Sequence, residues 1–262
     1  MQISNVSSVV FSATGSTELI VRRIADGVAA RADVPVADRF DITREAKQVK
    51  RPFTADELVV IGVPSYGGRV PAPAASKIAA CKGNGAPAVL VVSYGNRDID
   101  DTLAELFDLA VEAGFEPIAA GAFVAQHSIF NAVAAGRPDA DDLAEIDAFA
   151  GRVADKASSD CAALVATDVP GNRPYREFGG VPFVPQVSGG CNECGRCALE
   201  CPVGAISIDN PKATDAQKCI ACMRCVKACP LGGRSVKGLK FKIAGWSFRR
   251  KCAERKGSLT FL

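Results

Sequence analysis

The sequence predicts an α/β protein with two parts, a doubly wound parallel β-sheet followed by a smaller α+β domain. Apolar strand-like runs alternate with amphipathic segments over the first 168 residues, which is typical of a parallel sheet covered by helices on both faces. Eight cysteines then gather behind a segment rich in proline and glycine. We therefore expect a sheet domain at 1–168, a Pro/Gly linker at 169–188, a cysteine-rich domain at 189–236 and a basic C-terminal tail at 237–262.

Each expected strand is a short run of β-branched and other apolar residues. The runs are 6–12, 40–43, 58–64, 88–94 and 118–124, and 40–43 is the weakest of them. Between them, apolar residues recur at helical spacing, so each helix has one face that packs on the sheet. These faces consist of Ile20, Ile24 and Val28, of Leu103, Leu106, Phe107, Ala110 and Val111, and of Leu143, Ile146, Phe149 and Val153. Ligands of such sheets bind at the carboxyl ends of the strands, near the point where the strand order reverses.

Three loops follow the carboxyl ends of expected strands. The first, 12–17, reads Ser-Ala-Thr-Gly-Ser-Thr and runs directly into a helix, where hydroxyl and N–H groups can hold a phosphate. The loops 64–71 and 93–98 each bring a tyrosine beside a glycine, Tyr66 and Tyr94; tyrosine stacks on flat rings, and glycine lets backbone approach them. The alternatives are ordinary helix capping by Ser and Thr, and tyrosines that only fill turns.

These three loops resemble the FMN-binding loops of flavodoxin-like domains, over residues 3–160. The resemblance implies a bound FMN and a sheet with the strand order 2-1-3-4-5. It also implies that Ser12, Thr14, Gly15, Ser16 and Thr17 bind the FMN phosphate. The residues that it places beside the isoalloxazine are Tyr66, Gly67, Gly68, Tyr94, Gly95 and Asn96. Pro64, Ser65 and Ser93 of the same two loops are expected to bind the cofactor as well.

The sequence departs from that family in a few positions. Ser16 stands where many flavodoxins have Asn, and either side chain can donate to a phosphate oxygen. Arg69 and Arg97 are additional cations, which either stabilise a reduced anionic flavin or pair with nearby carboxylates, those of Asp98, Asp100 and Asp101; pairing is favoured. His127 is the only histidine. It has no recognisable catalytic partner, so we expect a loop histidine with satisfied hydrogen bonds.

A four-cysteine run occurs twice in the second domain. Cys191, Cys194, Cys197 and Cys201 precede Pro202, and Cys219, Cys222, Cys225 and Cys229 precede Pro230, each cysteine 28 positions after its counterpart. Structural zinc favours two separated C-x2-C pairs, and disulfides need an oxidising compartment, so both are weaker interpretations. Over 183–236 the pattern resembles two-cluster bacterial ferredoxins, in which the fourth cysteine of each run ligates the other cluster.

That resemblance implies two 4Fe–4S clusters with crossed ligand sets. One cluster would take Cys191, Cys194, Cys197 and Cys229. The other would take Cys219, Cys222, Cys225 and Cys201. The proline after each fourth cysteine lacks an N–H and ends the short helix there.

Charge is distributed unevenly along the chain. Residues 1–168 contain 15 Lys and Arg against 23 Asp and Glu, a net charge of −8, and 169–262 contain 16 against 6, a net charge of +10. Cluster thiolates would cancel part of the positive charge, so nucleic acid is not an expected partner. The basic tail is either a solvated face or a docking segment for the acidic domain or an acidic redox partner; contact with a membrane surface stays open.

The N-terminal residues contain neither a basic region nor an apolar signal segment, and no apolar run is long enough to span a bilayer. We therefore expect a cytoplasmic protein whose cysteines bind metal. The whole chain resembles the flavodoxin–ferredoxin fusion proteins of anaerobic bacteria and archaea. We expect an electron-transfer protein that relays electrons between FMN and two clusters and on to redox partner proteins. The alternative is a flavin-dependent reductase of a small substrate, whose binding pocket would be lined by Tyr66, Arg69, Tyr94 and His127. A redox sensor is the third possibility.

Overall fold

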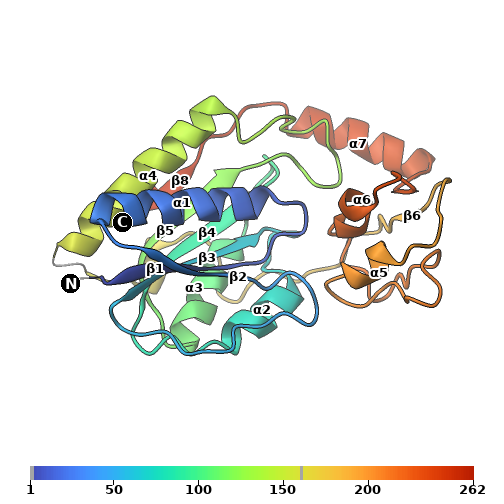
Figure 1. Ribbon diagram of the computed structural model, residues 1–262. Coiled ribbons are helices and arrows are strands. Elements are labelled where there is room, and N and C mark those ends of the chain that lie inside the picture. Colours follow the sequence, from blue (N-terminus) through green and yellow to red (C-terminus); the bar gives the residue numbers. More distant parts are fainter. Residues whose placement is uncertain (1–2, 160–161) are drawn as a thin grey trace.

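The computed structural model describes residues 3–159 and 162–262, and its N-terminal part is a layered α/β domain (Figure 1). The strand order is β2-β1-β3-β4-β5-β8, in which the first five strands are parallel. The predicted order 2-1-3-4-5 is confirmed. These strands are β1 (Asn5–Val10), β2 (Val36–Asp41), β3 (Glu57–Pro64), β4 (Pro87–Tyr94) and β5 (Glu116–Val124). We call the part before residue 169 the sheet domain.

Both faces of the sheet are buried beneath helices. Along β3, Val60 points to one hydrophobic core and Ile61 to the other, because successive strand side chains point to opposite faces. The first core packs against α1 (Ser16–Ala32) and α4 (Ala140–Ser158), and the second against α2 (Ala72–Ala79) and α3 (Thr102–Glu112). The pattern did not predict α2, since four of its eight residues are alanine and it buries only two side chains.

The Pro/Gly-rich segment 169–185 lies along the sheet domain as an extended strap. After the short 3-10 helix η1 (Ala166–Asp168), the backbone N–H groups of Asn172 and Arg176 donate to the carboxylate of Asp101, both at 2.7 Å. Arg173 pairs with Asp108 on α3 at 2.8 Å. Residues 172–176 of the strap are therefore held to α3 and its N-cap by charged side chains.

The cysteine-rich region, 189–236, is small and built mostly of loops. It contains the single-turn helices α5 (Arg196–Leu199) and α6 (Arg224–Ala228), and β6 (Gln186–Val187) pairs antiparallel with β7 (Arg234–Ser235) at its border. The Arg234 side chain is buried and donates to the carbonyl of Pro211 at 2.7 Å and to Thr214 Oγ1 at 2.9 Å. One guanidinium thus joins loops that bury little apolar surface of their own.

The last part of the chain returns to the sheet domain. Helix α7 (Leu239–Lys251) leads to β8 (Leu259–Phe261), which pairs antiparallel with β5 through Ala120 and Ala122. Figure 1 shows α7 at the outer edge of the molecule and both chain ends together at the far end of the sheet. The sequence did not predict these two elements within the basic tail. Across the described residues, no helix combines the length and apolar character that crossing a membrane requires.

Candidate functional site

The three predicted loops meet at one cavity of about 330 Å³ beside the carboxyl ends of β1, β3 and β4. This is the edge where the strand order reverses between β1 and β3, as expected for a doubly wound sheet. Ten of the fourteen residues that the resemblance assigns to FMN line the cavity: Thr14, Ser16, Thr17, Pro64, Ser65, Tyr66, Gly67, Ser93, Tyr94 and Gly95.

The first loop has the geometry of an anion-binding helix start. Gly15 precedes α1 with a positive φ of 94° and has no side chain with which to cap the helix, and the first N–H groups of α1 have no backbone partner within it. Ser12 accepts the N–H of Glu18 at 3.1 Å, and the hydroxyls of Thr17 and Ser93 lie 2.7 Å apart. These contacts fix the loop and join it to the third loop. The donor set fits a phosphate without any Lys or Arg.

Four predicted residues do not line the cavity: Ser12, Gly15, Gly68 and Asn96. Ser12 holds the loop from behind, as described. At Gly68, φ is 84° and an added Cβ would lie 2.3 Å from a carboxylate oxygen of Asp100; glycine is needed there for close packing, not for ligand contact. The Asn96 amide donates to the carbonyls of Cys252 and Glu254, at 3.0 and 2.7 Å.

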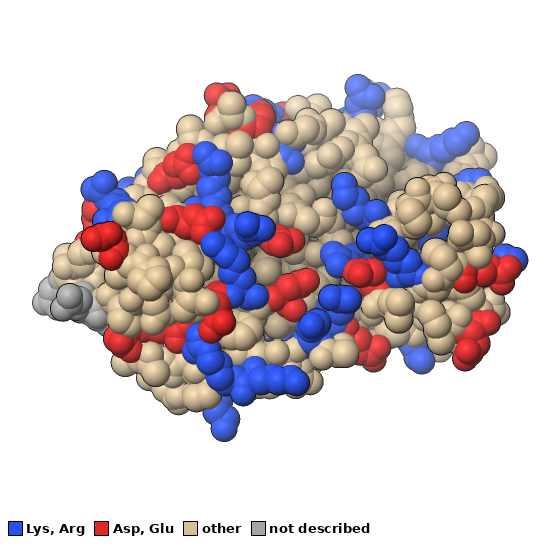
Figure 2. Space-filling model, in the orientation of Figure 1, with Lys and Arg blue, Asp and Glu red and all other residues tan. Residues whose placement is uncertain are grey.

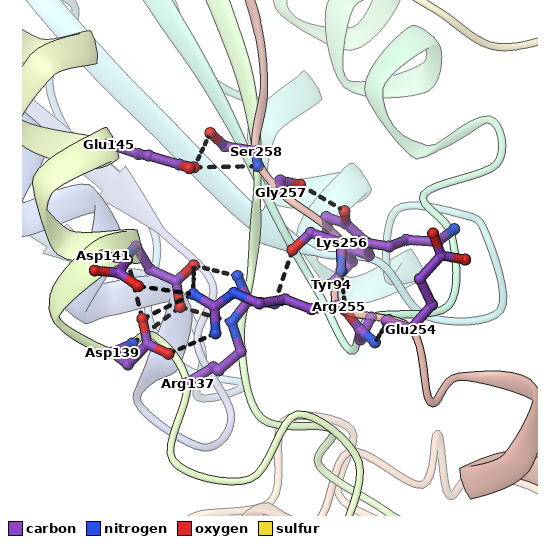
Figure 3. A network of polar contacts seen from close by, with 12 residues as sticks. Tyr94, Arg137, Asp139, Asp141, Glu145, Glu254, Arg255, Lys256, Gly257 and Ser258 are labelled. Carbon is purple, nitrogen blue, oxygen red and sulfur yellow. Dashed lines mark hydrogen bonds and ion pairs between the residues drawn. The ribbon is translucent and has the colours of Figure 1, made fainter.

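The third loop is fastened to the C-terminal segment. The Tyr94 hydroxyl donates to the carbonyl of Gly257 at 3.1 Å, and burial raises the pKa of Tyr94 to about 12. Arg137 donates to the carbonyl of Lys256 at 2.8 Å, and Arg255 pairs with Asp139 at 2.6 Å (Figure 3). We call residues 252–258 the latch. The Tyr94 hydroxyl therefore serves the latch, while its ring remains at the cavity.

An aromatic cluster forms the far wall of the cavity, and the sequence did not predict it. Phe130 follows β5, Phe183 comes from the strap, and Phe241 and Phe248 come from α7. Phe130 stacks on Phe241 with ring centres 5.3 Å apart. These residues come from three remote segments, so no local pattern indicates that they share a wall. The cluster shields this side of the cavity from water.

His127 lies between this wall and the third loop. Its ring meets Phe248 edge-on at 4.9 Å, and its Nδ1 accepts the backbone N–H groups of Ile129 and Phe130 at 3.2 and 3.1 Å. Burial, aided by the charge of Arg97, lowers the pKa of His127 to about 4. The histidine is neutral near pH 7 with its proton on Nε2. The prediction of a satisfied loop histidine is confirmed, although the ring also lines the cavity.

The two additional arginines both form ion pairs. Arg97 lines the cavity and pairs with Asp100, one of the expected carboxylates. Arg69 pairs instead with Glu105 on α3, at 2.7 Å, and does not line the cavity. The expectation that both arginines form ion pairs is thus confirmed. The carboxylates expected to pair with Arg69 were wrong, because the first turn of α3 brings Glu105 next to it.

Four cysteines line a second, smaller cavity: Cys201, Cys219, Cys222 and Cys225. Three come from the second run and one from the first. Backbone N–H groups donate to two of the sulfurs, Ala205 to Cys201 at 3.3 Å and Ala221 to Cys219 at 3.4 Å. Within the part of the chain that the structure describes, no three His, Cys, Asp or Glu side chains converge closely enough to hold one metal ion. Four thiolates are the donor set of a 4Fe–4S cluster.

The other four cysteines of the two runs are Cys191, Cys194, Cys197 and Cys229. Cys197 is buried, Cys194 is exposed, and Cys191 and Cys229 are half-buried. The N–H of Gly233 donates to the Cys229 sulfur at 3.2 Å. This set is the more solvent-accessible of the two.

Residues 186–242 match the family model of the 4Fe-4S dicluster domain. They cover both cysteine runs and follow a sheet of flavodoxin-like strand order. The chain has the organisation of a flavodoxin–ferredoxin fusion. The match supports iron–sulfur clusters in the second half of the fusion, and such clusters serve electron transfer.

Solved structures similar to the fusion resemble its sheet domain. An archaeal flavodoxin has 16% identity, covers 59% of this chain and 99% of its own, and gives a TM-score of 0.43. A Streptococcus pneumoniae flavodoxin has 17% identity, covers 59% of this chain and 99% of its own, and gives a TM-score of 0.39. Rubredoxin oxygen:oxidoreductase from Desulfovibrio gigas has 14% identity, covers 60% of this chain and 37% of its own, and gives a TM-score of 0.42. No curated protein matches the chain. The fold assignment rests on the observed strand order.

The two halves of the fusion meet at the cavities. Ile220 lines both the loop cavity and the cavity of four cysteines, so its side chain is part of the wall between them. Arg224, two residues after Cys222, donates to the carbonyls of Ser12 and Ala13 at 3.2 and 3.4 Å. It also pairs with Glu200. The cysteine loop is thus bonded directly to the loop 12–17.

Tyr66 lies on the same boundary. Burial raises the pKa of its hydroxyl well above the ordinary value; nearby Cys222 raises it further, and Arg224 opposes them. The ring lines the loop cavity and packs against the sheet core, as does Ile220. A tyrosine that the sequence assigned to the flavin thus also lies near a cluster cysteine.

Proposed function

We propose that this protein transfers electrons between an FMN in the loop cavity and two 4Fe–4S clusters, and on to redox partner proteins in anaerobic metabolism. The observation that supports this best is the wall residue Ile220, common to the loop cavity and the cavity of four cysteines. Two redox sites whose cavities share a lining residue are suited to direct transfer. When bound, FMN exchanges two electrons and each cluster exchanges one.

The residues of the chain then have separate tasks. The 12–17 loop binds the phosphate through N–H and hydroxyl groups, and the Tyr66 and Tyr94 rings border the isoalloxazine. Neutral His127 presents an Nε2–H donor and adds no charge. The aromatic wall excludes water from the flavin. Backbone N–H groups directed at cysteine sulfurs adjust the cluster potentials.

We further propose an order of transfer. The cluster of Cys201, Cys219, Cys222 and Cys225 is the one adjacent to the flavin, because its cavity adjoins the loop cavity at Ile220. The cluster of Cys191, Cys194, Cys197 and Cys229 is the outer one, since Cys194 is exposed. Electrons would enter or leave the protein at the outer cluster.

Cofactor analysis tests the first part of this proposal. Anaerobically purified full-length protein is expected to contain about eight irons, eight sulfides and one FMN per chain. Four irons would contradict the second cluster, and absence of flavin would contradict the role of the loop cavity. A stepwise reductive titration followed by visible absorption and EPR then assigns the centres.

Paired cysteine substitutions test the order. Cys194→Ser is expected to remove the outer cluster and leave rapid electron exchange between flavin and the remaining cluster. Cys219→Ser is expected to remove the adjacent cluster and to slow exchange between flavin and the outer cluster strongly, measured in single turnover. Cys81→Ser is the matched control, because Cys81 lies in the sheet domain away from either cavity. Equal rates in the two cluster variants would contradict the order.

A flavin-dependent reductase is the second candidate. The loop cavity extends beyond the three FMN loops toward His127, Phe130 and Phe248, which leaves apolar space beside a hydrogen-bond donor. Sustained turnover of a small acceptor by the purified protein, without any partner protein, would favour this function. Its absence, together with reduction of added redox proteins, would favour the carrier.

A further inference from the structure

Helix α7 has two contrasting sides. On its inner side, Ala244 and Phe248 line the loop cavity, and Phe241 and Phe248 pack against Phe130 in the aromatic wall. Its outer side carries Leu239, Ile243 and Trp246, which are 73%, 59% and 63% exposed. Spacings of four and three residues align these three side chains along one helical face. The chain thus exposes a stripe of large apolar groups that the fold does not use.

The same helix is strongly basic. From residue 237 to 251 the sequence has six Lys and Arg and no Asp or Glu. Among the residues that the structure describes, no carboxylate pairs with Lys240, Lys242, Arg249, Arg250 or Lys251. Figure 2 shows basic side chains without acidic neighbours at the upper right, the region of α7 in Figure 1.

The cations of α7 differ from those of the latch. Arg255 is bound by Asp139 and Asp142 of the sheet domain, at 2.6 and 3.4 Å. The acidic sheet domain therefore takes up the latch arginine and leaves the helix cations free for an external anionic surface. Arg250 lies over the Trp246 ring, 4.8 Å from its centre, so charge and apolar surface are presented together.

We propose that the outer side of α7 docks onto an anionic phospholipid membrane surface. Helices that lie in the plane of a membrane combine a stripe of Leu, Ile and Trp with flanking Lys and Arg, and anionic lipid attracts the cations. Tryptophan favours the headgroup region because its ring is apolar and its N–H is polar. Helix α7 lies at the outer edge of the molecule (Figure 1), and the three side chains of its stripe are more than half exposed, which suits a deformable flat surface better than the complementary hollow of a protein.

The helix is formed before docking. Phe130 stacks on Phe241 at 5.3 Å, and an added Cβ at Gly245 would lie 3.2 Å from Phe130, so the inner side is in contact with the rest of the protein. A surface that is already ordered loses little conformational entropy when it binds. Docking would lay the protein against the bilayer with the loop cavity directly behind α7, without any segment crossing the membrane.

Vesicle binding tests this proposal. Full-length protein with its cofactors is sedimented with vesicles of phosphatidylcholine alone or of equal parts phosphatidylcholine and phosphatidylglycerol. We expect binding to the anionic vesicles only, weakened by added salt. Trp246 is the only tryptophan, and its emission should shift to shorter wavelength on docking.

Two variants separate the two contributions. Ile243→Ser with Leu239→Ser should lower the vesicle partition coefficient by more than about tenfold, and Arg249→Gln with Arg250→Gln should lower it by roughly tenfold at low salt. The matched controls are Val165→Ser and the pair Arg22→Gln with Lys50→Gln, which remove exposed groups from other parts of the surface and should bind normally. Unchanged flavin and iron content shows that each variant is folded.

Three outcomes would overturn the proposal. One is no binding to anionic vesicles at low salt. Another is vesicle binding that is unchanged in the Leu239→Ser, Ile243→Ser variant, because this would indicate that only charge attracts the protein to the lipid. The third is binding to polyglutamate, used as a probe for acidic protein, without binding to anionic vesicles. That result would assign the surface to an acidic protein partner.

Discussion

His127 links the third loop to the aromatic wall, and its protonation changes the stability of the fold in a direction that can be worked out. The folded protein holds this imidazole neutral, with a pKa of about 4, whereas an unfolded chain protonates it near 6.5. Below pH 6.5 the unfolded state therefore binds a proton that the folded state does not, and the free energy of unfolding falls as pH falls from about 6.5 to about 4.

We predict that His127→Gln removes this part of the pH dependence. Relative to the variant, the natural protein should lose about 2 kcal/mol of unfolding free energy between pH 7 and pH 5, measured by urea denaturation at both pH values. Since His127 is the only histidine, its NMR signals report directly; they should titrate below pH 5 in the folded protein and near 6.5 in urea. A folded-state titration near pH 6.5 would contradict this.

Gly95 is packed directly against the His127 ring. An added Cβ would lie 2.5 Å from Cδ2 and 2.8 Å from Cγ of the histidine. Gly95→Ala should therefore displace the third loop, destabilise the fold by about 1–3 kcal/mol and weaken flavin retention. Flavin content after dialysis and thermal unfolding measure these effects. Gly151→Ala is the control, because in helix α4 its Cβ would meet only Arg31, at 4.0 Å, and alanine favours a helix.

At the scale of elements, we expect the attachment of the latch to depend most on a buried ion pair of the sheet domain. Arg137 and Asp142 both have side chains only 7% exposed, and Arg137 also donates to the carbonyl of Lys256. Arg137→Leu would leave the Asp142 carboxylate buried without its partner, so we predict a loss of about 3–5 kcal/mol. Arg255→Gln, at a half-exposed pair with Asp139, should cost at most about 1 kcal/mol. Chemical denaturation of both variants gives the comparison; equal losses would show that the latch does not depend on the buried pair.

The elements that sequence patterns predicted are those with local signals. β3 and β4 are buried along their whole length, so they stand out as apolar runs, and the cysteine spacing alone indicated the cluster loops. β8 has only three residues, and its pairing with β5 depends on a contact between remote segments. For the same reason the sequence placed Asn96 beside the flavin, whereas its amide binds the latch, a segment more than 150 residues away.

At the scale of the whole molecule, α7 lines the loop cavity and β8 returns the chain to the sheet. We predict that deleting residues 239–262 opens the cavity, so that flavin is lost faster on dilution, while the cysteine runs keep their iron. Flavin fluorescence released over time and iron content measure the two effects. Deleting Leu262 alone, which lies beyond β8, is the control and should change neither. Retention of flavin in the long deletion would show that the three loops suffice.

The return of β8 to the sheet also determines how the two redox parts can move. The strap leaves the sheet domain and β8 rejoins it. The cysteine-rich region is therefore attached to the sheet domain at both of its ends, unlike a domain that hangs on one flexible linker. Closing the chain at a second point restricts its excursions and keeps the local concentration of one part near the other high. Electron exchange within the protein should consequently need no diffusional search, and its rate should not depend on solvent viscosity.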